Sequence, residues 1–130
     1  MHHREALWQM VEETRQAEQT AVLCHNDLTP ANQLYSGGKL WALDWEYCAM
    51  GSPWFDLAVA ITGHSLDEVQ TADLLFHYLQ QPATAGELNL VQQHSSLCRY
   101  LELLWHLGQS APGADSVCLE GKLALLEANL

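Results

Sequence analysis

The chain has 130 residues, of which 48% are hydrophobic, so we expect one compact domain with a buried core. Its 5 Lys and Arg residues stand against 16 Asp and Glu, and the formal charge of −11 argues against nucleic acid or an anionic membrane as a partner. No apolar stretch reaches the roughly 20 residues of a membrane-spanning helix and the polar start is unlike a secretory signal, so we expect a cytoplasmic protein.

The first part of the chain predicts a helix followed by short strands. Apolar or small residues recur at helical spacing over residues 5–19, which predicts a helix with one buried stripe. Residues 21–24 are apolar and β-favouring. Residues 33–35 and 39–43 flank a Gly37-Gly38 pair, which accepts the positive φ of a hairpin turn. The polar segment between these strands is therefore expected in a loop.

The second part predicts helices. Ser52 is the expected N-cap and Pro53 the first residue of a helix that is apolar on almost every face and therefore packs inside the domain. The sequence SLDE at residues 65–68 matches a capping box for a helix that ends before Pro82. Its expected buried stripe comprises Leu66, Val69, Ala72, Phe76 and Leu79.

Two further helices complete the expected fold. A long helix is predicted from about residue 86 to residue 109, and a last helix follows the loop at residues 110–116. The expected class is α+β and mostly helical, with a small β-hairpin element beside a polar loop.

Four motifs occur in a fixed order. They are His-Asn-Asp at residues 25–27, Asn32, Asp-Trp-Glu-Tyr at residues 44–47 and GSPWFDLA at residues 51–58. The pattern resembles the C-terminal lobe of the choline kinase and aminoglycoside phosphotransferase family, which has a protein-kinase-like fold. His-Asn-Asp with Asp-Trp-Glu-Tyr is more similar to bacterial choline kinases than to aminoglycoside kinases, in which His-Gly-Asp is usual.

Phosphoryl transfer gives three of these residues expected roles. Asp27 is the expected catalytic residue, which orients the acceptor hydroxyl and takes its proton. Asn32 and Asp44 are the expected oxygen ligands of the Mg²⁺ that accompanies ATP. Taken singly, Asp27 or Asn32 would be an ordinary loop former. Their joint occurrence with His25 and Asp56 in family order favours a kinase ancestry.

Three further residues are candidates for binding the acceptor. By resemblance to choline kinases, Tyr47 contributes to a pocket for a quaternary ammonium group, where aromatic faces attract a cation. Alternatively, Tyr47 is a half-buried residue that only packs against its neighbours. Glu46 could approach a metal ion or a substrate cation, or be an ordinary exposed loop glutamate. Trp105 on the long helix is either a pocket residue or, as is more usual for an aromatic at helical spacing, a core residue. Trp54 and Phe55 are expected in the core.

Two residues are expected to support the site without reacting. The family resemblance implies that His25 holds the catalytic loop by hydrogen bonding and that Asp56 braces it. Asp56 lies in an apolar segment, so its carboxylate needs hydrogen bonds or the favourable field of a helix N-terminus.

The N-terminal lobe of the family, with its phosphate-clamping lysine, has no counterpart in the sequence. Only about twenty residues precede the motif; they hold no lysine, and the first is Lys39. We therefore expect residues 1–130 to form a single C-terminal lobe that has weak or no kinase activity alone. A homodimer or a separate N-terminal lobe would cover its exposed surface.

The expected function is ATP-dependent phosphorylation of a small, cationic alcohol, choline or a related amino alcohol. The same fold could act on thiamine, an aminoglycoside or a sugar. A non-catalytic interaction domain derived from such a kinase is the third interpretation.

Overall fold

The computed structural model describes residues 5, 8, 9, 11, 12 and 21–109. The helix predicted over residues 5–19 falls largely outside this part, and the last predicted helix falls wholly outside it. The described elements are strands β1 (Val22–Cys24), β2 (Gln33–Ser36), β3 (Lys39–Ala42) and β4 (Ala49–Gly51), the 3-10 helix η1 (Pro30–Asn32), and helices α2 (Pro53–Gly63), α3 (Glu68–Leu79) and α4 (Ala85–Gln109).

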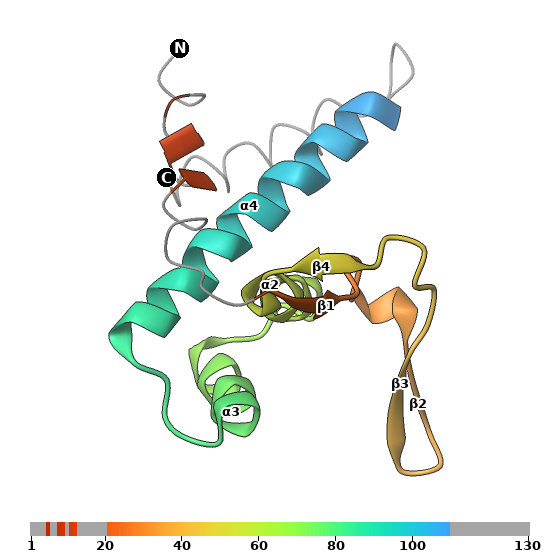
Figure 1. The fold of residues 1–130 in the computed structure, drawn as a ribbon. Helices are drawn as coiled ribbons and strands as arrows, with labels where there is room; N and C mark the ends of the chain where they lie inside the picture. Colours follow the sequence, from red (N-terminus) through yellow and green to blue (C-terminus); the bar gives the residue numbers. More distant parts are fainter. Residues whose placement is uncertain (1–4, 6–7, 10, 13–20, 110–130) are drawn as a thin grey trace.

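The strands form two antiparallel pairs, one nested inside the other. β1 pairs with β4, and between them in sequence β2 pairs with β3. The predicted hairpin is confirmed, and Gly37 and Gly38 at its turn have φ of 60° and 73°. In Figure 1 this hairpin extends away from the helices. β4 was not predicted, because its three residues carry no alternating pattern. The nesting leaves two connecting segments, residues 25–32 and 43–48, between the same two sheets.

Helix α2 begins as predicted. The Ser52 side chain accepts a hydrogen bond from the backbone N–H of Trp54, and Pro53 is the first helical residue. Ala58, Val59 and Ile61 are its buried residues. α2 packs against β1 and against α4, and in the view of Figure 1 the β1–β4 pair overlaps it. This helix therefore links the first strand pair to the long helix.

Helix α3 differs from its prediction in both start and buried face. Its N-cap is Asp67, which forms a capping box with Gln70, whereas Ser65 precedes the helix with φ of 53°. Leu75 is fully buried, while Val69 is 78% exposed. Phe76 is also exposed. Leu66 and Leu79 of the predicted stripe do pack against the core, whereas Val69, Ala72 and Phe76 are exposed. The stripe was only partly correct because apolar residues occur on more than one side of this helix, so periodicity does not select the buried face.

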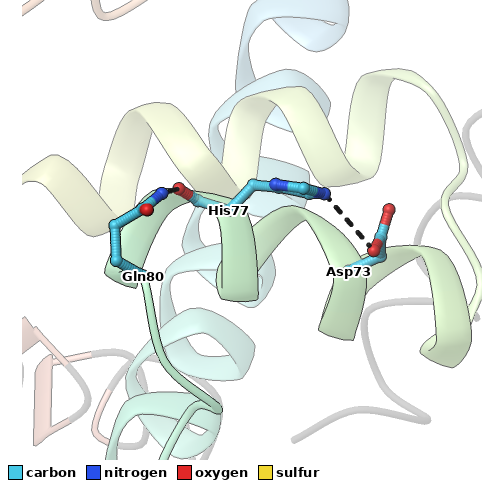
Figure 2. A network of polar contacts seen from close by, with 3 residues as sticks. All are labelled: Asp73, His77 and Gln80. Carbon is cyan, nitrogen blue, oxygen red and sulfur yellow. Dashed lines mark hydrogen bonds and ion pairs between the residues drawn. The ribbon is translucent and has the colours of Figure 1, made fainter.

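The end of α3 carries a polar network on its solvent side. Gln80, at φ of 57°, donates from Nε2 to the backbone oxygen of His77 at 2.5 Å. His77 Nε2 lies 3.6 Å from Asp73 Oδ1, one helical turn earlier (Figure 2). Both side chains are largely exposed, so this pair contributes little to stability. The network terminates the helix and lies outside the site described below.

The core of the described part of the chain lies between α2, α3 and α4. Ile61, Leu75 and Val91 form its buried centre, one residue from each helix, and Trp54 packs against them as expected. The long helix α4 is confirmed at the predicted bounds to within one residue. None of the described helices is long and apolar enough to cross a membrane.

Candidate active site

Hydrogen bonds join the segments 25–32 and 43–48 side by side. The Leu43 N–H donates to the backbone oxygen of Asn32 at 2.8 Å, and Leu43 oxygen lies 2.8 Å from His25 Nε2. The Asn26 side chain donates from Nδ2 to the backbone oxygen of Tyr47 at 2.9 Å. We call residues 25–32 the first loop and residues 43–48 the second loop. The candidate residues of both loops are thus held within one small region.

His25 is buried and both of its ring nitrogens face backbone groups. Nδ1 accepts the N–H of Asp27 at 3.3 Å, so Nε2 is the nitrogen that donates to Leu43 oxygen. The ring also packs on Trp45, with a centroid separation of 4.7 Å. With both nitrogens engaged, the imidazole holds the two loops together and has no free position for proton transfer.

Asp56 fastens the start of the first loop to α2. One carboxylate oxygen accepts the N–H of His25 at 2.7 Å, and the other accepts the N–H of Asn26 at 2.8 Å. Asp56 lies in the first turn of α2, where the helix field favours a negative charge. The hydrogen bonds that this acid was expected to need are therefore present.

Asp27 and Asn32 interact directly. Asn32 Nδ2 donates to Asp27 Oδ2 at 2.7 Å and to the backbone oxygen of Asp27 at 3.0 Å. These contacts orient the Asp27 carboxylate and engage one of its two oxygens. No described residue donates a hydrogen bond to Asp27 Oδ1 or to Asn32 Oδ1, which leaves both oxygens available to a ligand.

The donor set at Asn32 and Asp44 suits a hard cation. Asp44 follows Leu43, whose backbone N–H is bonded to Asn32, and it is exposed with φ of 60°. Its carboxylate makes no hydrogen bond or ion pair within the part of the chain that the structure describes. Mg²⁺ prefers one or two carboxylate or amide oxygens and retains water or phosphate oxygens at its other positions. The described residues hold no cluster of three or more His, Cys, Asp or Glu side chains placed for a metal ion, so these two oxygens would supply only part of the shell.

A cavity of about 930 Å³ lies between the two loops, α2 and α4. Asp27, Glu46, Tyr47 and Trp105, predicted from sequence as catalytic or acceptor-binding residues, all line it. The remaining lining residues are Asn26, Thr29, Phe55, Val59, Thr62, Gly63, Cys98, Leu101, Glu102 and His106. No lysine or arginine is among the described residues that line it. Its described lining therefore carries three carboxylates, and the one basic group among these residues is the histidine His106.

Several lining residues differ from expectation or were missed. Trp105 is 61% exposed, so the alternative that placed it in the core is wrong. Phe55, expected in the core, lies in the cavity wall. Glu102 and His106 received no role, although Glu102 precedes Trp105 by one helical turn and His106 follows Trp105 directly; Glu102 Oε1 lies 3.7 Å from His106 Nε2. The i, i+3 spacing of Glu102 to Trp105 and its i, i+4 spacing to His106 were the available signal.

Cys98 lies in the same wall as a protonated thiol. Burial, and next the negative charge of Asp56, raise its pKa to about 12. A thiol with so high a pKa is unreactive at neutral pH. Cys98 therefore adds an apolar surface to the cavity and no nucleophile.

Comparison with known proteins decides the family. Residues 2–88 match the family model described as the phosphotransferase enzyme family. The chain belongs to this phosphotransferase family. The match includes both loops and Asp56, and ends before α4 reaches Trp105.

Relatives and solved structures agree with this assignment. Protein LicA of Haemophilus influenzae is 32% identical to this chain over 87 residues, which are 65% of this chain and 33% of that protein. The chain thus spans about a third of the length of such curated relatives. A choline/ethanolamine kinase family protein from Mesorhizobium loti has 27% identity and a TM-score of 0.81, with 97% of this chain and 44% of that chain covered.

A second solved structure supports the fold alone. The choline kinase LicA from Streptococcus pneumoniae has 23% identity and a TM-score of 0.77, with 97% of this chain and 45% of that chain covered. The predicted α+β, kinase-like fold class is confirmed by these structures.

Proposed function

We propose that this phosphotransferase transfers the γ-phosphate of ATP to the hydroxyl of a small cationic alcohol, choline or a related amino alcohol. The observation that carries the proposal is that Asp27 lines the same cavity as Tyr47, Trp105, Glu46 and Glu102. The cavity thus holds both a carboxylate that can take a hydroxyl proton and side chains that can attract a cation.

The lining of the cavity favours a positive acceptor. The carboxylate of Glu46 supplies negative charge, and the described lining residues include no lysine or arginine. The faces of Tyr47 and Trp105 can each attract an ammonium group, by about 0.5 to 2 kcal/mol. A sugar would gain nothing from this charge. A choline or ethanolamine headgroup would gain from both features.

Asp27 is the proposed catalytic residue. Asn32 holds Asp27 Oδ2, so Oδ1 is the atom that can accept the hydroxyl proton. The acceptor oxygen bonds to the γ-phosphorus as the bond from that phosphorus to the bridging oxygen breaks, and ADP leaves. Because the transition state needs little covalent help, positioning the hydroxyl is the main contribution of this residue.

Asn32 and Asp44 are the proposed metal ligands. Asn32 Oδ1 and the Asp44 carboxylate would hold Mg²⁺, which when bound supplies positive charge to neutralise the phosphates. His25 and Asp56 are proposed to act only by fixing the first loop, through the backbone contacts described above.

We further propose that turnover by these 130 residues alone is weak. The family clamps the nucleotide phosphates with a lysine, and no lysine precedes His25 in this sequence. A homodimer or a separate N-terminal lobe is the proposed source of the remaining contacts. A cytoplasmic location remains a prediction.

Binding of choline and of a neutral isostere tests the proposed acceptor without requiring turnover. In 3,3-dimethyl-1-butanol a carbon replaces the ammonium nitrogen, so the molecule keeps the shape and hydroxyl of choline but lacks its charge. Calorimetric titration should give a lower Kd for choline than for the isostere, because only choline interacts with the carboxylates and ring faces. Equal affinity for both ligands, or no choline binding, would contradict the proposed substrate class.

The Glu46→Gln variant tests the same point from the protein side. It keeps the size of the side chain and removes one charge, so the Kd for choline should rise while that for the isostere stays constant. A parallel change for both ligands would show that Glu46 acts on shape and not on charge.

A further inference from the structure

We propose that Asn26 is a positioning residue, whose side chain holds Glu46 and Tyr47 of the second loop in the wall of the acceptor cavity. The proposal rests on the proposed function, since it concerns how the acceptor side of that site is shaped. Asn26 stands between His25 and Asp27, and no chemical step above requires its side chain.

The backbone of Asn26 explains why few residue types fit this position. Its φ of 64° lies in the left-handed region, which glycine adopts without strain and asparagine tolerates better than most residues. Its N–H donates to Asp56 Oδ1 at 2.8 Å, and any residue except proline could make this contact. The backbone would therefore be satisfied by glycine, and the asparagine side chain must be explained separately.

The side chain of Asn26 links the two loops. Nδ2 donates to the backbone oxygen of Tyr47 at 2.9 Å. Within the described chain, no other hydrogen bond joins residues 46–48 to the first loop, and all residues of the second loop are exposed. Leu43, at the start of the second loop, is held separately through His25 and Asn32. The Asn26 contact thus fixes the half of the second loop that carries Glu46 and Tyr47.

A second cavity gives this half of the loop somewhere to move. It measures about 500 Å³ and is lined by Asn26, Tyr47, Ser52, Phe55, His94 and Leu97. Asn26, Tyr47 and Phe55 line both cavities and therefore separate them. Without the hydrogen bond, Tyr47 can shift toward the second cavity, and the acceptor cavity then loses its shape for part of the time. The apparent Kd of a ligand that needs the formed cavity rises in inverse proportion to the fraction of time for which the cavity is formed.

The Asn26→Gly variant removes the link and keeps the backbone conformation. The Kd for choline, measured by calorimetry, should rise about threefold to tenfold, the range that corresponds to the net contribution of one hydrogen bond. The amide hydrogen of Cys48, which donates to Trp45 oxygen at 3.1 Å within the second loop, should exchange faster in the variant without any ligand. Gln33→Ala is the matched control, because Gln33 donates to Leu28 oxygen at 2.9 Å within the same region but does not line the cavity; its choline affinity should match that of the wild type.

The Asn26→Asp variant separates positioning from direct contact with the acceptor. Aspartate tolerates the same φ, but its carboxylate cannot donate to Tyr47 oxygen and it adds negative charge to the cavity. Because that charge also attracts a cation, affinity alone does not separate the two roles. Positioning predicts faster exchange of the Cys48 amide hydrogen in Asn26→Asp, as in Asn26→Gly, whereas direct contact alone predicts unchanged exchange.

Unchanged exchange of the Cys48 amide hydrogen in Asn26→Gly, or choline affinity of that variant equal to that of the wild type, would overturn the inference. Unchanged exchange in Asn26→Asp would overturn it as well. If choline fails to bind the wild-type chain, the proposed acceptor class fails, and the exchange measurement still decides whether Asn26 holds the second loop.

Discussion

Cys98 shows how the cavity wall changes the chemistry of a single side chain. The thiol is largely shielded from water, and the Asp56 carboxylate adds a second reason for it to stay protonated. Since the pKa of Cys98 is raised to about 12, its thiolate fraction at pH 8 is about 10⁻⁴. Cys48, by contrast, is exposed in the second loop.

Alkylation by iodoacetamide tests this description of Cys98. In a Cys118→Ser background, peptide mass spectrometry of the folded chain should show rapid modification of Cys48 and almost none of Cys98 up to pH 9. Both should react once the chain is unfolded in urea, because unfolding restores the water contact of the Cys98 thiol. Comparable rates for the two cysteines in the folded chain would show that Cys98 is not shielded.

Individual site residues were predictable to different degrees from sequence. Asp27 and Asn32 stand five positions apart in a polar loop, and the contact between their side chains follows from that local spacing. The partnership of Asp56 with His25 spans 31 residues, and only the family resemblance indicated it. The left-handed backbone of Asn26 was not predicted, because a single asparagine in a loop is compatible with many conformations.

At the scale of elements, the end of α2 lies against η1 of the first loop. A Cβ added at Gly63 would lie 2.7 Å from Pro30 Cδ, closer than a Cβ atom can approach. Pro30 is a rigid ring at the start of η1, so the two segments can meet here only because residue 63 has no side chain. This approach helps to hold Asn32, at the end of η1, near Asp27.

Replacing Gly63 by alanine should therefore destabilise the fold and disturb the site together. Alanine is the better helix former by about 1 kcal/mol, but overpacking against Pro30 costs about 1 to 3 kcal/mol, so the free energy of unfolding should fall. Gly86→Ala is the matched control: its Cβ would lie 3.9 Å from Thr84 Oγ1, an ordinary contact, and the change should stabilise α4. Urea unfolding measures both, and a stabilised Gly63→Ala variant would refute the proposed close packing.

Helix starts were predictable where the capping chemistry was unambiguous. Ser52 with Pro53 gave the start of α2 correctly. At α3 two polar residues, Ser65 and Asp67, competed for the N-cap position, and the capping box with Gln70 selected Asp67. The SLDE pattern predicted Ser65 alone, and Asp67 is recognised as the N-cap only in the folded chain.

At the scale of the whole molecule, the nested strand pairs create the site. β1 and β4 are paired across more than twenty residues, and that pairing sets the first and second loops beside each other. Long-range pairing leaves little trace in local sequence, which explains why β4 was missed. The hairpin carries exposed apolar residues in opposed pairs, Leu34 with Trp41 and Tyr35 with Leu40, so its surface is suited to a further partner.

The central claim is that a metal held by Asn32 and Asp44 and an acceptor held beside Asp27 occupy one shared site. Mn²⁺ can replace Mg²⁺ and speeds the relaxation of nearby protons, so the trimethylammonium protons of choline report their proximity to the metal. In a choline-saturated solution of the chain, adding Mn²⁺ with ATP should raise their relaxation rate above that of a protein-free control. The Asp44→Asn variant should give the control value. A wild-type rate equal to the control while choline is bound would contradict the account.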